Sequence, residues 1–164
     1  MILAIDPGNI ESGVVILDEN LQPTSRGKID NEVLLKKIIQ NFEYIDHVAI
    51  EMVACYGMAV GKSIFDTCVW IGRFSQAVRE HLGIEPTYIY RKDEKMNLCN
   101  SMKAKDSNII QALIDRFAPN TPNKGKGTKS DKGWFYGFKK DIWQAYAVGV
   151  TYHDMYLKGE LENE

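Results

Sequence analysis

Three acidic residues of the chain stand where an uncompensated carboxylate is unfavourable. Asp6 ends the apolar segment MILAID, Glu51 interrupts the apolar segment HVAIEMV, and Asp141 lies where a basic loop meets an apolar segment. A buried, ionised carboxylate needs a compensating partner, and neither apolar segment contains a Lys or an Arg. A divalent cation held by Asp6 and Glu51, with Asp141 as a third ligand, would supply that compensation. Ligand sets made only of oxygens suit Mg²⁺ or Mn²⁺ better than zinc.

Each acid also has a simpler explanation. Asp6 or Glu51 could face solvent at a strand end, and Asp141 could be the N-cap of the following helix. Because all three acids occur in such positions, a shared metal site is favoured over a separate structural explanation for each. A nucleotide site is not expected, although Gly61-Lys62-Ser63 looks like the end of a phosphate-binding loop. The first glycine of that motif would fall at position 56, which is Tyr56.

The elements that must position these acids alternate between strands and helices. Apolar runs and turn residues predict strands at 1–6, 12–19, 22–29, 47–53 and 86–90, of which the first three form an antiparallel meander. Helical periodicity predicts helices at 31–42, 62–82, 104–117 and 141–157, with Asp30 as an N-cap, Gly83 as a helix stop, and Val33, Leu34 and Ile38 on a core-facing stripe. This order predicts an α/β domain around a mixed sheet.

Four segments resemble the RuvC-type Holliday-junction resolvases of the RNase H-like superfamily, and most closely their phage and Gram-positive branch. They are IDPG at 5–8 followed by Ser12-Gly13, AIEMV at 49–53, AKDSNIIQAL at 104–113, and DIWQAYAV at 141–148. The element order agrees over residues 1–157. The resemblance implies an RNase H-like mixed sheet, with three antiparallel strands and then parallel strands, flanked by helices. It implies one nuclease domain over residues 1–158, followed by an acidic tail at 159–164.

The resemblance also implies a mechanism with two Mg²⁺ or Mn²⁺ ions about 4 Å apart in each active site. Asp6 would bridge the two ions, Glu51 would hold one, and Asp141 would complete the set. Members of the family carry a second acid one turn further along the last helix. This chain has Gln144 there, which offers a metal only a neutral carbonyl oxygen and so weakens the case for a second ion.

The net charge hides a strong local segregation. The chain has 20 Lys and Arg against 22 Asp and Glu, a formal charge of −2, which taken alone argues against nucleic-acid binding. Residues 123–140 nevertheless contain six Lys and one Asp, a local charge of +5, with Trp134, Phe135, Tyr136 and Phe138 among them. Lysines neutralise phosphates and aromatic rings stack on unpaired bases. The alternative is a flexible, solvated loop whose aromatic rings pack onto the core.

Predicted DNA contacts fall in three places. The basic loop contributes Lys124, Lys126, Lys129, Lys132, Trp134, Lys139 and Lys140. From the resemblance, Lys103 and Lys105 beside the AKDSN segment and the loop at 52–62, with Tyr56 and Lys62, would also face DNA. For Tyr56 a buried position in the core is the open alternative.

The expected function is resolution of Holliday junctions or other branched DNA by paired nicks that leave a 5′ phosphate and a 3′ hydroxyl. Two symmetric nicks imply a homodimer, for which the helix at 62–82, with Ile64, Cys68, Trp70, Ile71 and Phe74, is the candidate interface. The rivals are a less selective branched-DNA or RNase H-type nuclease and, because of Gln144, a junction-binding protein with weak or no catalysis. Three scattered cysteines and no signal peptide or membrane-spanning run predict a cytoplasmic protein, in the host cytoplasm if a phage encodes it.

Overall fold

The structure is a computed structural model that describes residues 1–40, 42 and 44–161. Its strands are β1 (Ile2–Asp6), β2 (Glu11–Leu17), β3 (Pro23–Asp30), β4 (His47–Met52) and β5 (Thr87–Tyr90). Its helices are α1 (Asn31–Ile39), α2 (Lys62–Ala77), α3 (Arg91–Cys99), α4 (Asp106–Phe117), α5 (Lys140–Tyr152) and α6 (Lys158–Leu161). Two π-helical turns, η1 (Val78–Leu82) and η2 (His153–Leu157), continue α2 and α5.

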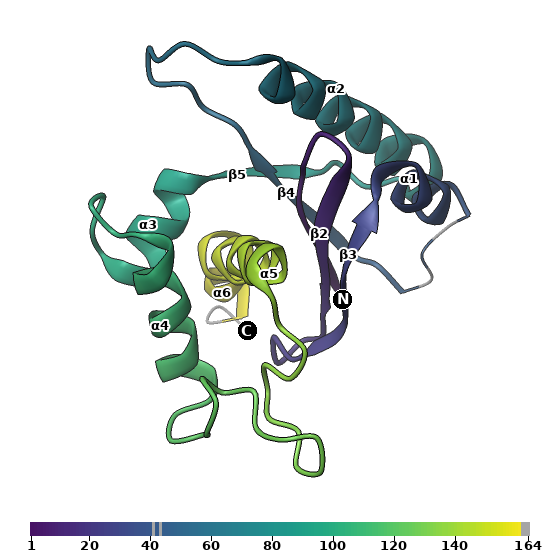
Figure 1. Cartoon of the computed structure of the whole chain (residues 1–164). Helices are drawn as coiled ribbons and strands as arrows, with labels where there is room; N and C mark the ends of the chain where they lie inside the picture. Colours follow the sequence, from purple (N-terminus) through teal and green to yellow (C-terminus); the bar gives the residue numbers. More distant parts are fainter. Residues whose placement is uncertain (41, 43, 162–164) are drawn as a thin grey trace.

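The five strands form one mixed sheet in the order β3-β2-β1-β4-β5. β1, β2 and β3 are antiparallel neighbours, whereas β4 runs parallel to β1 and β5 runs parallel to β4. The expected mixed sheet, with an antiparallel meander followed by parallel strands, is therefore confirmed. Figure 1 shows α1 and α2 on one face of the sheet, α5 on the other, and α3 and α4 beside α5. Among the described residues, no helix combines the length and apolarity needed to cross a bilayer.

Strand alternation divides the interior into two cores. On the α5 face lie Ile2, Ala4 and Ala49, together with much of α5. On the opposite face lie Leu3, Ile5, Val48 and Ile50, together with Leu34 and Ile38 of α1 and Ile71 and Phe74 of α2. Since successive side chains on a strand point to opposite faces, Asp6 continues the Ile2–Ala4 series and Glu51 continues from Ala49. Both acids therefore belong to the α5 face.

Most predicted helix ends are found in the structure. Asp30 caps α1 by accepting hydrogen bonds from the backbone N–H groups of Glu32 (2.9 Å) and Val33 (3.2 Å). Gly83 has a φ of +66° and ends η1 in the left-handed conformation. Val33 is a correction, because its side chain is 45% exposed while Leu34 and Ile38 are buried. The tail predicted at 159–164 starts within α6, and its residues 162–164 lie outside the described residues.

Helix α3 was not predicted, because the segment RKDEKMNLC has no apolar stripe. It begins directly after β5, where the backbone N–H of Tyr90 donates a hydrogen bond to Asp93 Oδ2 at 2.9 Å. Asn100 ends it in the left-handed region with a φ of +49°. The residue of α3 that is buried is Glu94, a carboxylate. The helix is thus stabilised by the Asp93 cap and by the buried Glu94, and not by an apolar face.

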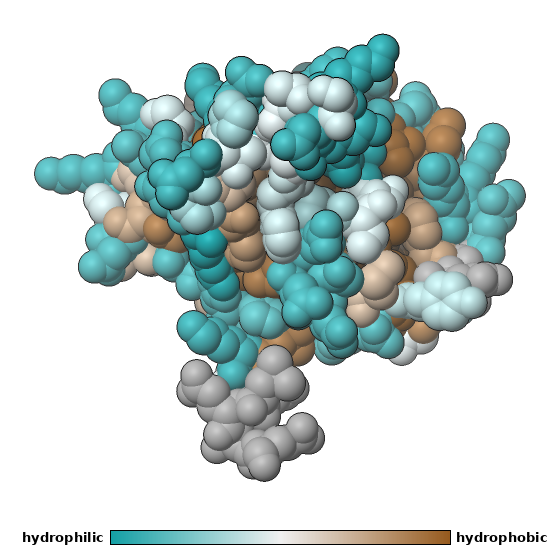
Figure 2. Space-filling view, turned by 90° about the horizontal axis from the view of Figure 1, so that it is seen from below, coloured by the Kyte–Doolittle hydropathy of each residue, from teal (hydrophilic) through white to brown (hydrophobic). Residues whose placement is uncertain are grey.

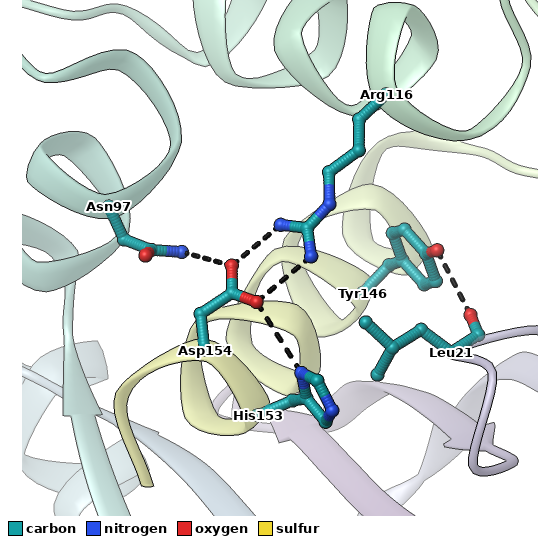
Figure 3. Close-up of polar contacts among 6 residues, drawn as sticks. All are labelled: Leu21, Asn97, Arg116, Tyr146, His153 and Asp154. Atoms are coloured by element: carbon teal, nitrogen blue, oxygen red, sulfur yellow. Dashed lines mark hydrogen bonds and ion pairs between the residues drawn. The ribbon is translucent and has the colours of Figure 1, made fainter. Parts of the chain in front are cut away.

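Asp154 in η2 joins the C-terminal segment to α3 and α4. Its carboxylate accepts hydrogen bonds from both Nη atoms of Arg116 (2.6 and 2.9 Å) and from Asn97 Nδ2 (2.9 Å). In α5, which η2 continues, the Tyr146 hydroxyl donates a hydrogen bond to the backbone carbonyl of Leu21, between β2 and β3, at 3.0 Å (Figure 3). The helix that carries Asp141 is therefore held both to α3 and α4 and to the β2–β3 turn.

Candidate active site

Asp6 and Glu51 come together because β1 and β4 are parallel neighbours whose carboxyl ends lie at the same edge of the sheet, with Ile5 opposite Ile50. Burial, then the negative charge of Glu51 and hydrogen bonding with it, raise the pKa of Asp6 to about 9. Burial also raises the pKa of Glu51 above its ordinary value. The two carboxyls thus form a coupled pair that resists carrying two negative charges without a cation.

Asp141 reaches the same edge from the first turn of α5. Its charge further raises the pKa of Asp6, so the two carboxyl groups interact. Asp141 Oδ2 also forms an ion pair with Lys28 Nζ on β3, at 2.9 Å. Lys139 is the N-cap of α5, and Asp141 lies inside the helix. The simpler explanation of Asp141 as an N-cap is therefore wrong.

Gln144 lies one turn after Asp141 and faces Arg91, the first residue of α3. Its Oε1 atom accepts a hydrogen bond from Arg91 Nη1. The same guanidinium donates to Glu94 and, through Nη2, to Asp106. The amide oxygen predicted as a neutral metal ligand is thus engaged by a guanidinium in this structure. Metal ligation by Gln144 stays a prediction, and it would require Gln144 to leave Arg91.

Glu94 is a further acid of this site that sequence reasoning missed. Its side chain is 0% exposed, Oε2 accepts from Arg91, and Oε1 has no hydrogen-bond partner among the described residues. Burial, then repulsion from Glu51, raises the pKa of Glu94 to about 9. The available signal was its place four residues after β5, the strand beside that of Glu51. The surrounding segment RKDEKMNLC is highly charged and has no apolar stripe, so no local pattern marks Glu94 as buried.

The donor chemistry of the site fits a hard divalent cation. Carboxylate oxygens predominate and they repel one another. In the described part of the chain, one buried carboxylate oxygen of Glu94 has no hydrogen-bond partner. Within the described residues, however, no three acidic, His or Cys side chains are gathered closely enough to hold one ion. Because Asp141 pairs with Lys28, it would have to exchange this partner to join Asp6 and Glu51 around a metal.

Two adjoining surface hollows open onto the acids. One is lined by Asp6, the Pro7–Asn9 turn, Glu11, Gly13, Lys28 and Asp141. The other is lined by Lys28, Gly137, Lys139, Lys140, Asp141 and Ile142. Lys28 and Asp141 line both, so two of the three predicted acids, Asp6 and Asp141, lie beside lysines. Glu51 lines neither hollow.

The basic loop between α4 and α5 is folded on itself. A Cβ on Gly133 would lie 2.4 Å from the carbonyl oxygen of Gly125, and one on Gly127 would lie 2.3 Å from that of Asp131. The glycines at these positions therefore permit close approaches of the backbone within the loop. Figure 2, seen from the side of this loop, shows mostly hydrophilic residues with apolar ones visible between them.

Three of the four aromatic residues of this loop pack against neighbouring aromatic rings of the chain. Phe135 and Phe138 are 0% and 1% exposed and pack against Trp143 and Tyr146, so base stacking by these two is excluded and packing onto the core is confirmed for them. Trp134 is half-buried, stacks on Phe117, and donates to the Tyr146 hydroxyl at 3.0 Å. A DNA contact by Trp134 stays a prediction, confined to its exposed part.

The remaining predicted DNA contacts lie at the surface. The exposed lysines are Lys62, Lys103, Lys105, Lys124, Lys129, Lys132, Lys139 and Lys140, whereas Lys126 is half-buried. Tyr56, in the loop between β4 and α2, is 66% exposed, so its alternative placement in the core is wrong. In Figure 1 this loop extends away from the sheet beyond the end of β4. Tyr56 is thus an exposed aromatic residue in the loop that follows Glu51.

The sheet order and its helices define an RNase H-like α/β fold, as in RuvC. One solved structure with this similarity is Thermus thermophilus RuvC in complex with Holliday junction substrate, with a TM-score of 0.65, 12% sequence identity, and coverage of 94% of this chain and 95% of that chain. Another Thermus thermophilus RuvC structure gives a TM-score of 0.66 at 15% identity, with the same coverage. No protein-family model and no curated protein sequence matches the chain.

Proposed function

We propose that the chain is a metal-dependent endodeoxyribonuclease that resolves Holliday junctions or other branched DNA by paired nicks, leaving a 5′ phosphate and a 3′ hydroxyl. The observation that carries the proposal is the pair of acids Asp6 and Glu51 at the carboxyl ends of two parallel neighbouring strands, with Asp6 lining a hollow that also contains Lys28 and Asp141. The RNase H-like fold supports it, and one similar RuvC structure contains a Holliday junction substrate.

In this proposal Asp6 and Glu51 hold Mg²⁺ or Mn²⁺, and Asp141 joins them when it leaves Lys28. When bound, a pair of such ions supplies activation of water and stabilisation of the leaving 3′ oxygen. Lys28 is then free to contact the phosphate, because its ammonium group already lines the hollow. Lys139 and Lys140 border the adjoining hollow and would hold the neighbouring backbone.

The branched substrate would lie across the basic loop. Lys124, Lys126, Lys129 and Lys132 would neutralise phosphates at a distance from the acids, while Lys103 and Lys105 would contact a second arm. Tyr56 and Lys62 would approach the branch point from the loop after β4. We further propose one nuclease domain over residues 1–158 and a cytoplasmic site of action; membership of the phage and Gram-positive branch stays a prediction.

A homodimer would bring two such sites to one junction, with α2 as the interface. Ile71 and Phe74 do not contribute, because they are buried in the core of their own chain at 2% and 0% exposure. The exposed face instead carries Phe65 (60% exposed) and Val69 (62% exposed), with Cys68 also exposed. An interface built on Phe65 and Val69 would bury apolar surface that now faces solvent.

A specific observation favours a second candidate, a junction-binding protein with weak or no catalysis. Gln144 replaces the expected acid and its carbonyl oxygen is engaged by Arg91. Cleavage of a mobile four-way junction, forks, flaps and RNA–DNA hybrids, with Mg²⁺ and Mn²⁺ titrated separately, distinguishes the candidates. Metal-dependent symmetric nicks in the four-way junction support the nuclease. Tight junction binding without cleavage in either metal supports the binding protein, and preferential cutting of hybrids supports an RNase H-type activity.

A further inference from the structure

We propose that Glu94 is a ligand of the metal site and supplies the carboxylate that position 144 lacks, with Arg91 positioning it. This inference rests on the proposed function, since it concerns the same site. It assigns Gln144 a structural role and gives α3 a direct part in metal binding.

The first argument is the burial of Glu94. It is 0% exposed, and Oε1 finds no hydrogen-bond partner among the described residues. A buried polar atom without a partner destabilises a fold by about 1–3 kcal/mol, and more when it is charged. A purely structural partner of Arg91 would not be expected to leave one of its two carboxylate oxygens buried without a hydrogen bond. A cation ligand, by contrast, needs an oxygen that is free of other partners.

The second argument is the position of α3. Glu51 on β4 is opposite Ile89 on β5, and α3 starts immediately after β5 at Arg91. Glu94 is therefore one helical turn from the strand end adjacent to Glu51. Among neighbouring charges, Glu51 has the largest effect on Glu94, and Glu94 also acts on Asp6. Glu94 thus belongs electrostatically to the same acid group as Asp6 and Glu51.

The third argument is the distribution of Arg91 contacts. Its guanidinium is divided among Glu94 Oε2, Gln144 Oε1 and Asp106 Oδ1. A structural ion pair would gain more from a bidentate contact with both oxygens of one carboxylate. Here one oxygen of Glu94 is held and the other is not. Arg91 therefore fixes the orientation of Glu94, and Gln144 completes the guanidinium's hydrogen bonding.

The charges of the site lead to the same conclusion. Arg91 and Lys28 are the cations paired with the acids of the site, and they also pair with Asp106 and Glu11. Fully ionised Asp6, Glu51, Glu94, Asp141, Asp106 and Glu11 would carry six negative charges against two positive ones, so 6 − 2 leaves an excess of four. Divalent cations would offset that excess. In this proposal Glu94 of α3 supplies the negative charge and the oxygen ligands that an acid at position 144 would otherwise provide.

The test is Mn²⁺ binding to the full chain without DNA, followed by calorimetry and by the metal-induced rise in Tm. Glu94→Gln is expected to weaken Mn²⁺ binding about tenfold or more, the range typical of lost metal-site interactions. Its metal-free Tm should be unchanged or higher, because a buried charge is removed. Glu85→Gln is the matched control: it neutralises a carboxylate that pairs with an arginine, Arg79, outside this site, and it should bind Mn²⁺ within about twofold of wild type.

The double variant Glu94→Gln with Gln144→Glu moves the carboxylate to the position one turn after Asp141, and it should recover most of the affinity. If Glu94→Gln lowers the metal-free Tm but retains wild-type Mn²⁺ affinity, Glu94 is only a structural partner of Arg91 and the inference is overturned. If Glu94→Gln does not fold, Glu94→Met, which has a similar volume and no charge, takes its place, and wild-type Mn²⁺ affinity of that folded variant overturns the inference equally. Absence of Mn²⁺ binding by the wild type overturns the proposed function as well. If Asp6→Asn abolishes Mn²⁺ binding and Glu94→Gln leaves it unchanged, the inference about Glu94 is overturned and the proposed function is not.

Discussion

Gly13 and Asp141 are packed so closely that a Cβ on residue 13 would lie 2.3 Å from the Asp141 carbonyl oxygen. Gly13 is also the register partner of Asp6 across β1 and β2. The first turn of α5 is therefore pressed against the strand beside Asp6, and the absence of a side chain at position 13 permits this contact. The separation of the two acids is set in part by a glycine that carries no functional group.

Replacing Gly13 by alanine should therefore displace the start of α5 and reduce both stability and cleavage. We expect a loss of about 1–3 kcal/mol in the free energy of unfolding, the usual range for overpacking. Urea denaturation and junction cleavage measure the two effects. Gly72→Ala in α2 is the control, since an added Cβ there meets nothing within 4 Å among the described residues. Equal behaviour of the two variants would contradict close packing at Gly13.

Asp6→Asn should abolish metal-dependent cleavage while junction binding is retained. The expected loss of rate is about a thousandfold or more, which corresponds to about 4 kcal/mol of transition-state stabilisation. Its metal-free stability should rise, because the cost of burying an ionisable carboxyl, and then its repulsion from Glu51, is removed. Gel cleavage and fluorescence anisotropy separate catalysis from binding, with the exposed Glu85→Gln as a control. Cleavage at the wild-type rate would exclude a metal site at Asp6.

Neutralising the loop lysines should weaken DNA binding and reduce its dependence on salt. With Lys124, Lys126, Lys129 and Lys132 changed to Gln, the slope of log K against log salt should fall by about 0.9 for each lost phosphate contact. Anisotropy titrations at several salt concentrations give the slope. Lys36→Gln with Lys37→Gln, on the exposed side of α1, is the control pair. An unchanged slope in the loop variant would show that DNA does not contact these lysines.

Acid should loosen the C-terminal helix through Asp154. Burial pushes the pKa of Asp154 upward, but hydrogen bonds from Arg116 and Asn97 outweigh it and hold that pKa below the ordinary value. The contact thus stabilises the fold above the unfolded-state pKa, and this contribution is lost as the pH falls through the lower folded-state value. Asp154→Asn should cost about 1–3 kcal/mol at neutral pH. Denaturation at pH 7 and below pH 4 should show the difference between variant and wild type shrinking in acid.

Much of the fold was predictable because its main strands are strongly patterned. The elements are marked directly by apolar runs such as MILAID and HVAIEMV and by the turn residues between them. The residues Asp30 and Gly83 mark helix ends. The same pattern located Asp6 and Glu51, since an acid in an apolar strand is conspicuous. Their proximity follows from the parallel pairing of β1 with β4, which a resemblance implied but periodicity alone did not.

What escaped prediction depends on tertiary contacts. Helix α3 buries Glu94 in place of an apolar stripe, so its sequence resembles a solvated segment. Phe135 and Phe138 looked available for stacking because they alternate with lysines, yet Trp143 and Tyr146 of α5 enclose them. The engagement of Gln144 by Arg91 joins residues 53 positions apart. No local pattern encodes such contacts.

Helix α5 is enclosed along nearly its whole length, with every residue from Ile142 to Tyr152 buried apart from the half-buried Gln144. A segment surrounded in this way opens only when the entire molecule does, so its central amide protons should be among the last to exchange with solvent. Asp141 stands at the first turn of this slowest-exchanging segment, where it meets water. One acid of the candidate site is thus attached to the helix that we expect to be the last to open.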